Sequence, residues 1–263
     1  VSIEGGMNIA NEYALGGSGR LVLSRSEKAE EPWRDVDVRL EGPVVQDTLN
    51  AFRRNWESLS GETIALSDHP RTWTQQEGTT PVRFVQHRPD EDGDQNTRNA
   101  YLQAIRSAQE SITIENAYFL PPAQLRNALI NAAHRGVKVR VMSNSRESND
   151  IGIVTDAARY FYDDLVEAGV EIYEKHGGTL HSKTMTVDGT YSIVGSVNLN
   201  GRSQWRDSES MAAINSESTA RRLETRFQSG ISECKRITKN ELGSESFTTN
   251  LKQWAISFLA PTF

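Results

Sequence analysis

The stretch HSKTMTVDGTYSIVGSVN, residues 181–198, places a histidine and a lysine two positions apart on a run of strand-forming residues. The Asp-Gly pair at 188–189 favours a tight turn between two strands, and the second strand ends in the tip GSVN, residues 195–198. Residues two apart on a strand share a face, so His181 and Lys183 are expected to project to the same side of a sheet. The stretch therefore predicts a hairpin that presents an imidazole, a fixed cation and a tip of small polar residues.

Upstream of this hairpin, strand-like and helix-like segments alternate. Apolar runs of strand length are followed by longer segments whose apolar residues recur at helical spacing, and some of these end at a glycine. Strands that alternate with helices in this way form sheets covered on both sides. We therefore expect an α/β fold with a mixed, largely parallel β-sheet flanked by helices on both faces. The expected strands are 82–87, 111–119, 137–145, 170–175 and 209–215, and the expected helices are 96–110, 122–136, 156–169 and 216–237.

The first part of the chain has its own pattern. Within residues 33–42, polar and apolar residues alternate from Asp35 to Leu40, the pattern of a half-buried strand. A helix is expected from Pro43, where proline suits the first turn, to about Ser58. The polar, proline-containing stretch 59–81 is the best candidate for a linker. The expected division of the chain is 1–80 and 81–263.

Composition excludes some classes of protein. Hydrophobic residues make up 37% of the 263 positions and charged residues 24%, values that are ordinary for a soluble globular protein. The net charge of −6 argues against wholesale nucleic-acid binding, which leaves a basic footprint. The single cysteine, Cys234, excludes an internal disulfide and a cysteine-based metal site.

A short repeat straddles the chain. The tip GGMN at 5–8 parallels GSVN at 195–198, and WRDVD at 33–37 parallels WRDSE at 205–209, in the same order. Applying the spacing of the second copy to the first would put the corresponding histidine and lysine upstream of Val1. We therefore expect the chain to be the C-terminal part of a longer protein.

The complete copy of the repeat has a specific spacing. It reads His-x-Lys, four residues, Asp, six residues, Gly-Ser-x-Asn, and this resembles the motif of the phospholipase D superfamily. Flanking stretches such as GGMNIANEY, NAYFLPP and AAHRGVKVRVM resemble bacterial cardiolipin synthases and related phosphatidyltransferases. The resemblance implies two motif copies, one per lobe, that meet at a shared site. On this interpretation, residues 1–80 are the remainder of the first lobe plus a linker, and residues 81–263 are the second lobe.

The resemblance also implies a chemistry, phosphodiester exchange through a phosphohistidine without metal or cofactor. The family pattern favours His181 as general acid/base, with a role as nucleophile the alternative, and Lys183 would neutralise developing phosphoryl charge. Glu209 is expected to accept from the other ring nitrogen of His181, and Asp37 would serve the first-copy histidine in the same way. The expected substrate-binding residues are Ser196, Asn198, Asn8, Gly6 and Tyr118.

Several assignments have a structural alternative. Asp188 is a catalytic candidate by motif, but an aspartate before glycine also suits the hairpin turn for local reasons, and we favour that role. Tyr118 could line the site or simply pack. Trp33 and Trp205 are expected to pack in the core.

The favoured function is phosphatidyl transfer, as in the synthesis of cardiolipin from two phosphatidylglycerols. Hydrolysis to phosphatidic acid is the alternative, since it needs the same residues with water as acceptor. A metal-independent nuclease is favoured less, because the chain is acidic and lacks a basic stripe. The phospholipid substrate implies peripheral contact with a membrane, expected at its cytoplasmic face. The missing N-terminal lobe would leave this chain as an inactive fragment.

Overall fold

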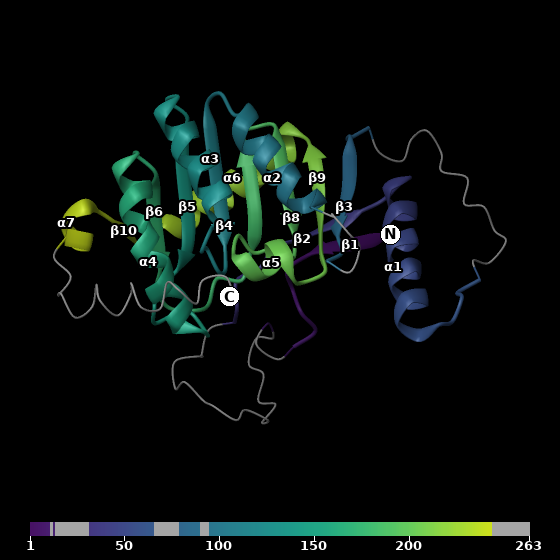
Figure 1. Ribbon diagram of the computed structural model, residues 1–263. Helices are drawn as coiled ribbons and strands as arrows, with labels where there is room; N and C mark the ends of the chain where they lie inside the picture. Colours follow the sequence, from purple (N-terminus) through teal and green to yellow (C-terminus); the bar gives the residue numbers. More distant parts are fainter. Residues whose placement is uncertain (11–12, 14–31, 66–78, 90–94, 244–263) are drawn as a thin grey trace.

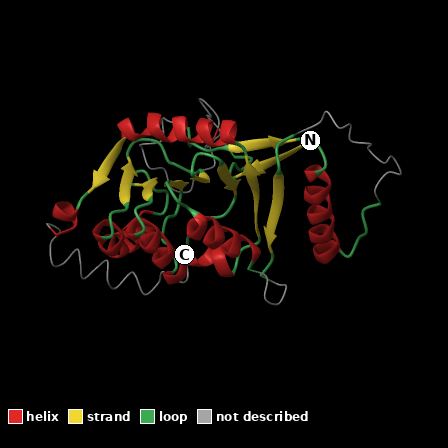
Figure 2. Ribbon diagram, turned by 90° about the horizontal axis from the view of Figure 1, so that it is seen from above, coloured by secondary structure: helices red, strands yellow, loops and turns green. Residues whose placement is uncertain are grey.

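The computed structural model describes residues 1–10, 13, 32–65, 79–89 and 95–243. These residues form an eight-stranded sheet with helices on both faces, and a two-stranded sheet at one end of it (Figures 1 and 2). The expected α/β architecture is therefore confirmed.

The large sheet is mixed. Its strand order is β10-β6-β5-β4-β7-β8-β9-β3, and within the described residues only the pairs β4–β5 and β5–β6 are parallel. The other five pairs are antiparallel, so the expectation of a largely parallel sheet was only partly met. Tight turns such as the Asp-Gly turn join antiparallel neighbours, whereas parallel neighbours require a crossover helix. The strands are β3 (Val82–His87), β4 (Ser111–Asn116), β5 (Lys138–Asn144), β6 (Glu171–Lys175), β7 (Lys183–Val187), β8 (Tyr191–Gly195), β9 (Glu209–Asn215) and β10 (Cys234–Ile237).

Two helical layers cover the sheet. One face carries α2 (Asn96–Ser107), α3 (Ala123–His134) and α4 (Gly152–Glu167), and the other carries α6 (Glu217–Gly230) (Figure 2). The short helices are α5 (Gly201–Trp205), η2 (Ile231–Glu233) and α7 (Lys239–Gly243). The expected helix 216–237 was too long, because the chain leaves the helix after Gly230 and residues 234–237 pair with β6 as edge strand β10.

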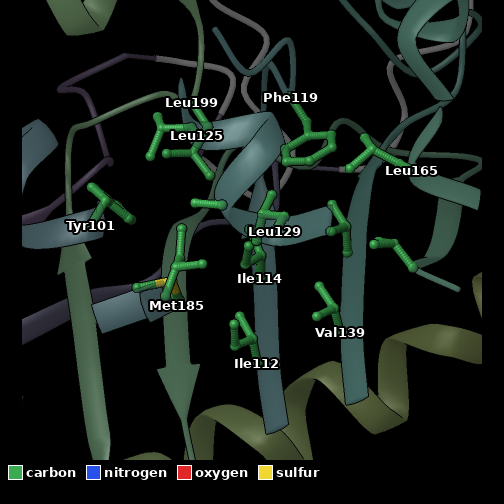
Figure 3. Close-up of a cluster of buried hydrophobic side chains, with 14 of the residues drawn as sticks. Tyr101, Ile112, Ile114, Phe119, Leu125, Leu129, Val139, Leu165, Met185 and Leu199 are labelled. Atoms are coloured by element: carbon green, nitrogen blue, oxygen red, sulfur yellow. The ribbon is translucent and has the colours of Figure 1, made fainter. Parts of the chain in front are cut away.

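The main core lies between the sheet and the layer formed by α2, α3 and α4. Ile112 and Ile114 of β4 point into it and pack with Leu125 and Leu129 of α3 (Figure 3). Strand alternation sends the residues between and after them to the opposite face, beneath α6. There Thr113 donates a 3.1 Å hydrogen bond to the carboxylate of Glu224. The layer under α6 is therefore partly polar.

The N-terminal segment packs on the β9 side of the large sheet. β1 (Ser2–Gly5) pairs antiparallel with β2 (Asp37–Leu40), and α1 (Val44–Ser60) follows at that end (Figure 1). Leu40 and Val44 form a buried cluster with Ala212 and Ile214 of β9. The helix expected from Pro43 is confirmed, whereas most of the expected linker lies outside the described residues and the division at 80/81 stays a prediction.

None of the helices within the described ranges is both long enough and apolar enough to span a bilayer.

Candidate active site

His181 stands just before β7, where the chain arrives from β6. Asn144, at the end of β5, clamps the preceding residue: its side-chain oxygen accepts from the Leu180 N–H at 2.8 Å, and its amide donates to the Leu180 carbonyl at 2.7 Å. The His181 N–H donates to the Arg34 carbonyl at 2.7 Å. Both the sheet and the N-terminal segment therefore fix the backbone that carries the imidazole.

The imidazole contacts a carboxylate from the first copy of the repeat. Asp35 Oδ2 lies 2.8 Å from His181 Nδ1, and the side chains are 0% and 10% exposed. The Tyr13 hydroxyl is 2.7 Å from the same nitrogen. In the neutral ring Nδ1 bears at most one proton, and an ionised carboxylate is the strongest acceptor beside it, so we assign that proton to Nδ1 with Asp35 accepting. This tautomer places the lone pair of the ring on Nε2, which can accept from the Lys183 ammonium at 3.0 Å.

Lys183 lies on the same side as His181, as the two-residue spacing predicts. Its Nζ is 2.8 Å from Nδ1 and 3.0 Å from Nε2 of the ring, and it also donates to the His181 carbonyl. Burial lowers the pKa of Lys183 to about 8, although the Asp35 carboxylate opposes this shift. A cation beside Nε2 is where charge on a phosphoryl oxygen would be stabilised.

The carboxylate beside His181 differs from the expected one. Glu209 was expected to orient the ring, but the partner of Nδ1 is Asp35, and Glu209 instead accepts a hydrogen bond from the Ser196 hydroxyl. Burial raises the pKa of Glu209, and the Ser196 hydrogen bond opposes that rise. The expectation was wrong because it kept each acid within its own copy of the repeat.

Asp37 and Glu209, the last residues of WRDVD and WRDSE, hold the tips GGMN and GSVN in place. Ser196 donates to Glu209 and accepts from the Ser210 N–H at 3.1 Å, and the Met7 N–H donates to Asp37 at 3.3 Å. Burial raises the pKa of Asp37, while the Met7 N–H lowers it. Asp37 and Glu209 therefore have matching structural roles.

The tip of the first copy lies against Lys183. A Cβ added at Gly6 would lie 2.9 Å from Lys183 Cδ and 3.0 Å from Asp35 Oδ1, which explains a glycine where the second copy has serine. Asn198 is half-buried, and among the described residues its Oδ1 has no hydrogen-bond partner. Asn8 is exposed. Of the expected substrate-binding residues, Gly6 therefore lies beside Lys183, and Asn198 retains an unused acceptor among the described residues.

Aromatic rings surround His181. The Trp33 ring centroid is 5.1 Å from that of His181, and the Tyr118 centroid is 6.3 Å away in an edge-on arrangement. The Tyr118 hydroxyl donates to Asp150 at 2.8 Å. Tyr118 therefore lines the site. Trp33 packs on the imidazole, so its expected place in the core was wrong.

Trp205 is not a core residue either. It is 45% exposed, and the Arg98 guanidinium lies 3.8 Å from the centre of its ring.

Asp188 has a structural role. Its carboxylate accepts from the N–H groups of Gln109, Glu110 and Ser111 at 3.0, 2.8 and 2.9 Å, at the far end of β7 from His181. Burial opposes its ionisation, yet these three donors outweigh burial and lower its pKa. Its φ of 51° is a turn conformation that aspartate tolerates. These contacts fit the turn role favoured from the sequence, and a catalytic role for Asp188 stays a prediction.

Sequence reasoning missed Asp35, Tyr13 and Glu4. The signal available in the sequence was that Asp35 lies inside the recognised WRD repeat, two residues before Asp37. Glu4 is buried and accepts from the Ser210 hydroxyl at 2.8 Å. Burial raises the pKa of Glu4 to about 7. Nothing in the local sequence distinguishes Glu4 from a surface glutamate.

The fold and the site together define a class of protein. Residues 101–231 match the family model described as the PLD-like domain of cardiolipin synthase. The fold is similar to that of a phosphatidylserine synthase from Haemophilus influenzae, with a TM-score of 0.57, 17% identity, and coverage of 87% of this chain and 56% of that one. A phospholipase D family member, Nuc from Salmonella typhimurium, aligns with a TM-score of 0.52 and 22% identity over 61% of this chain and 99% of its own. Residues 101–231 therefore form a phospholipase D-like domain.

Its relatives in sequence are cardiolipin synthases. A probable cardiolipin synthase from Bacillus subtilis is 32% identical over 89% of this chain and 44% of its own length. A cardiolipin synthase from Listeria welshimeri is 30% identical over 99% of this chain and 52% of its own length. The chain therefore spans about half the length of the curated relatives it matches.

Proposed function

We propose that this chain carries one half of an active site for phosphatidyl transfer of the cardiolipin synthase type. One histidine nitrogen forms a bond to phosphorus as the bond from phosphorus to the leaving alcohol breaks, and a second imidazolium gives its proton to that alcohol. The second imidazole then takes the proton of an incoming alcohol, whose oxygen displaces the phosphohistidine. With phosphatidylglycerol as both donor and acceptor, the products are cardiolipin and glycerol.

The observation that carries this proposal is the arrangement of Asp35, His181 and Lys183. A buried carboxylate on Nδ1 prepares Nε2 as a base or nucleophile, and the ammonium group 3.0 Å from Nε2 lies where phosphoryl oxygens would gather. We assign His181 as general acid/base, with the nucleophile role as the alternative. The sequence relatives named above support the lipid substrate.

The second histidine would come from another lobe. His-x-Lys followed by Gly-Ser-x-Asn occurs once in the sequence. Asp35 of the first copy serves His181 of the second, so a buried carboxylate of the second copy would serve the histidine of the first copy. Asp207 matches Asp35 in the repeat but pairs with Arg202 at the surface, so we assign this role to the buried Glu209. Asp37, expected earlier in that role, would then support the GGMN tip.

Hydrolysis to phosphatidic acid remains the alternative, because it uses the same residues with water as acceptor. A nuclease activity has less support, since the net charge is −6. A phospholipid substrate also implies peripheral contact with a membrane, and the cytoplasmic face stays a prediction.

A product assay tests the proposal. The full-length protein is incubated with phosphatidylglycerol in mixed micelles, and cardiolipin plus glycerol are the expected products, whereas phosphatidic acid would indicate hydrolysis. His181→Asn should abolish both. Unchanged turnover in that variant would overturn the proposal. Residues 1–263 alone should show negligible turnover, and robust activity would instead indicate two copies that pool His181.

A further inference from the structure

We propose that Arg34, Glu115 and Arg226 form a partly buried clamp that positions Asp35 against His181, with the buried Glu115 as the positioning residue at its centre. The clamp joins the N-terminal segment to β4 and α6. Its link to catalysis rests on the proposed function of His181, but the contacts that define it do not.

The backbone around Arg34 lies beside the chain that leads to His181. The Arg34 N–H donates to the Thr179 carbonyl at 2.8 Å, and the Arg34 carbonyl accepts from the His181 N–H at 2.7 Å. The Ser182 hydroxyl donates to the same carbonyl at 3.3 Å. This parallel bridge between Arg34 and Leu180 fixes the position of Asp35 relative to the imidazole of His181.

The Arg34 side chain crosses beneath the site to α6. Its Nη2 donates to Glu115 Oε1 at 3.2 Å and to the Arg226 carbonyl at 2.8 Å. A Cβ added at Gly230 would lie 2.5 Å from Arg34 Nη1, so the guanidinium occupies the space that any larger residue would need. A cation is also favourable at the C-terminal turn of a helix. Glu115 and the C-terminal turn of α6 therefore both shape the site that the Arg34 guanidinium occupies.

Glu115 holds two cations together. Its side chain is 3% exposed, and Arg226 Nε lies 3.6 Å from its second oxygen. Arg226 Nη2 in turn donates to the Asp35 carbonyl oxygen at 3.0 Å. Removing either arginine would leave the buried Glu115 charge less compensated, and removing Glu115 would leave two like charges side by side, so the group behaves as a unit.

The alternation of β4 explains why Glu115 reaches this position. Glu115 projects to the face covered by α6, together with Thr113, whereas the next residue, Asn116, accepts from the Leu199 N–H at 3.0 Å beyond the tip of the second copy. Two consecutive residues at the end of one strand therefore serve two parts of the site.

The clamp leaves Asp35 little freedom. Oδ1 accepts from the Val36 N–H at 2.8 Å, and Oδ2 faces His181 Nδ1 at 2.8 Å. A shift of the segment by about 1 Å would break the second contact, and misplacement of that size in an active site can cost about 10²-fold in rate.

The test reads the tautomer of His181, which does not require turnover. In this chain labelled with ¹⁵N, the ring nitrogen shifts of His181 are assigned by loss of signal in His181→Asn. With the ring neutral, Glu115→Gln should lower the ratio of the Nδ1–H to the Nε2–H form by about fivefold or more. Gly230→Ala should act in the same direction by displacing Arg34, even though alanine favours the helix.

The matched control is Glu224→Gln. Glu224 is also a carboxylate beneath α6, where it pairs with Arg140 at 3.1 Å and accepts from Thr113, but it has no part in the clamp. It should lower stability without changing the tautomer ratio. In the full-length protein, Glu115→Gln should reduce kcat by up to about 10²-fold with little change in KM.

The clamp is overturned if Glu115→Gln and Gly230→Ala fold and keep the wild-type tautomer ratio while Asp35→Asn changes it. An equal change in Glu224→Gln would also overturn it, since the effect would then follow stability. If Glu115→Gln changes the tautomer ratio of His181 but the full-length protein shows no phosphatidyl transfer, the proposed function is refuted and the clamp stands.

Discussion

Asp35 and His181 are 146 residues apart in the chain, yet the Asp35 carboxylate lies 2.8 Å from the imidazole Nδ1. The contact joins the first copy of the repeat to the second. The first copy of the repeat therefore supplies the acceptor for the histidine of the second copy.

Replacing Asp35 by asparagine should remove the acceptor that holds the proton on Nδ1. We expect kcat of the full-length protein to fall by about 10²–10⁴-fold, because an amide can donate to Nδ1 and favour the wrong tautomer. Steady-state assays with phosphatidylglycerol measure this loss. Asp207→Asn is the control, since Asp207 occupies the matching place in the second copy but pairs with Arg202 at its surface. A kcat within twofold of wild type in Asp35→Asn would contradict the assignment.

The charge of Lys183 should give the reaction an alkaline limit. Its pKa of about 8 means that the ammonium form is present below that pH and is lost as the pH rises through it. The rate should therefore decline above about pH 8, and Lys183→Met should cost about 10²–10³-fold at neutral pH. A pH–rate profile checks the first statement. Identical alkaline limits in wild type and Lys183→Met would show that another group titrates.

Glu4 should make the folded state less stable as the pH rises. Burial raises its pKa from 4.5 to about 7, so the folded chain binds a proton that the unfolded chain releases. Its stabilising contribution is complete below about pH 4.5 and is lost as the pH rises through about 7, a change on the order of 3 kcal/mol.

Glu4→Gln should flatten this dependence, because glutamine resembles the protonated acid and can still accept from Ser210. Urea unfolding at about pH 5 and about pH 8 measures the difference. The exposed Glu41 provides the control substitution Glu41→Gln, which should leave the dependence unchanged. A wild-type pH dependence in Glu4→Gln would rule out Glu4 as the source.

Asp188→Ala should lower stability without affecting chemistry. Three backbone N–H groups would lose a charged acceptor, and hydrogen bonds to charged groups contribute roughly 1.5–3 kcal/mol. Asparagine tolerates positive φ and keeps one acceptor, so Asp188→Asn should lose less. Thermal unfolding ranks the two variants. A large fall in kcat of a well-folded Asp188→Asn protein would instead support a catalytic role for Asp188.

The local features of the site could be predicted from the sequence. The two-residue spacing of His181 and Lys183 puts them on one face, and the Asp-Gly pair forms the turn, because strand alternation and turn geometry act over a few residues. The repeat also identified both tips and the acids that follow them.

The sheet order was harder to predict. The alternation of strands and helices indicated crossovers, and β4–β5 and β5–β6 are indeed parallel, but the remaining neighbours are antiparallel. The sequence pattern of residues 234–237 continues that of the preceding helix, yet these residues pair with β6. An open sheet edge can override a weak local preference for helix.

The sequence by itself determined the superfamily motif, the hairpin that carries it, and the presence of a second tip. Only the tertiary structure decided which carboxylate faces His181, where Trp33 packs, and how Arg34 and Glu115 hold the segment in place. The physical reason is range. Spacing along a strand is local, whereas a contact across 146 residues depends on the packing of β1, β2 and α6 against the sheet, which no short pattern encodes.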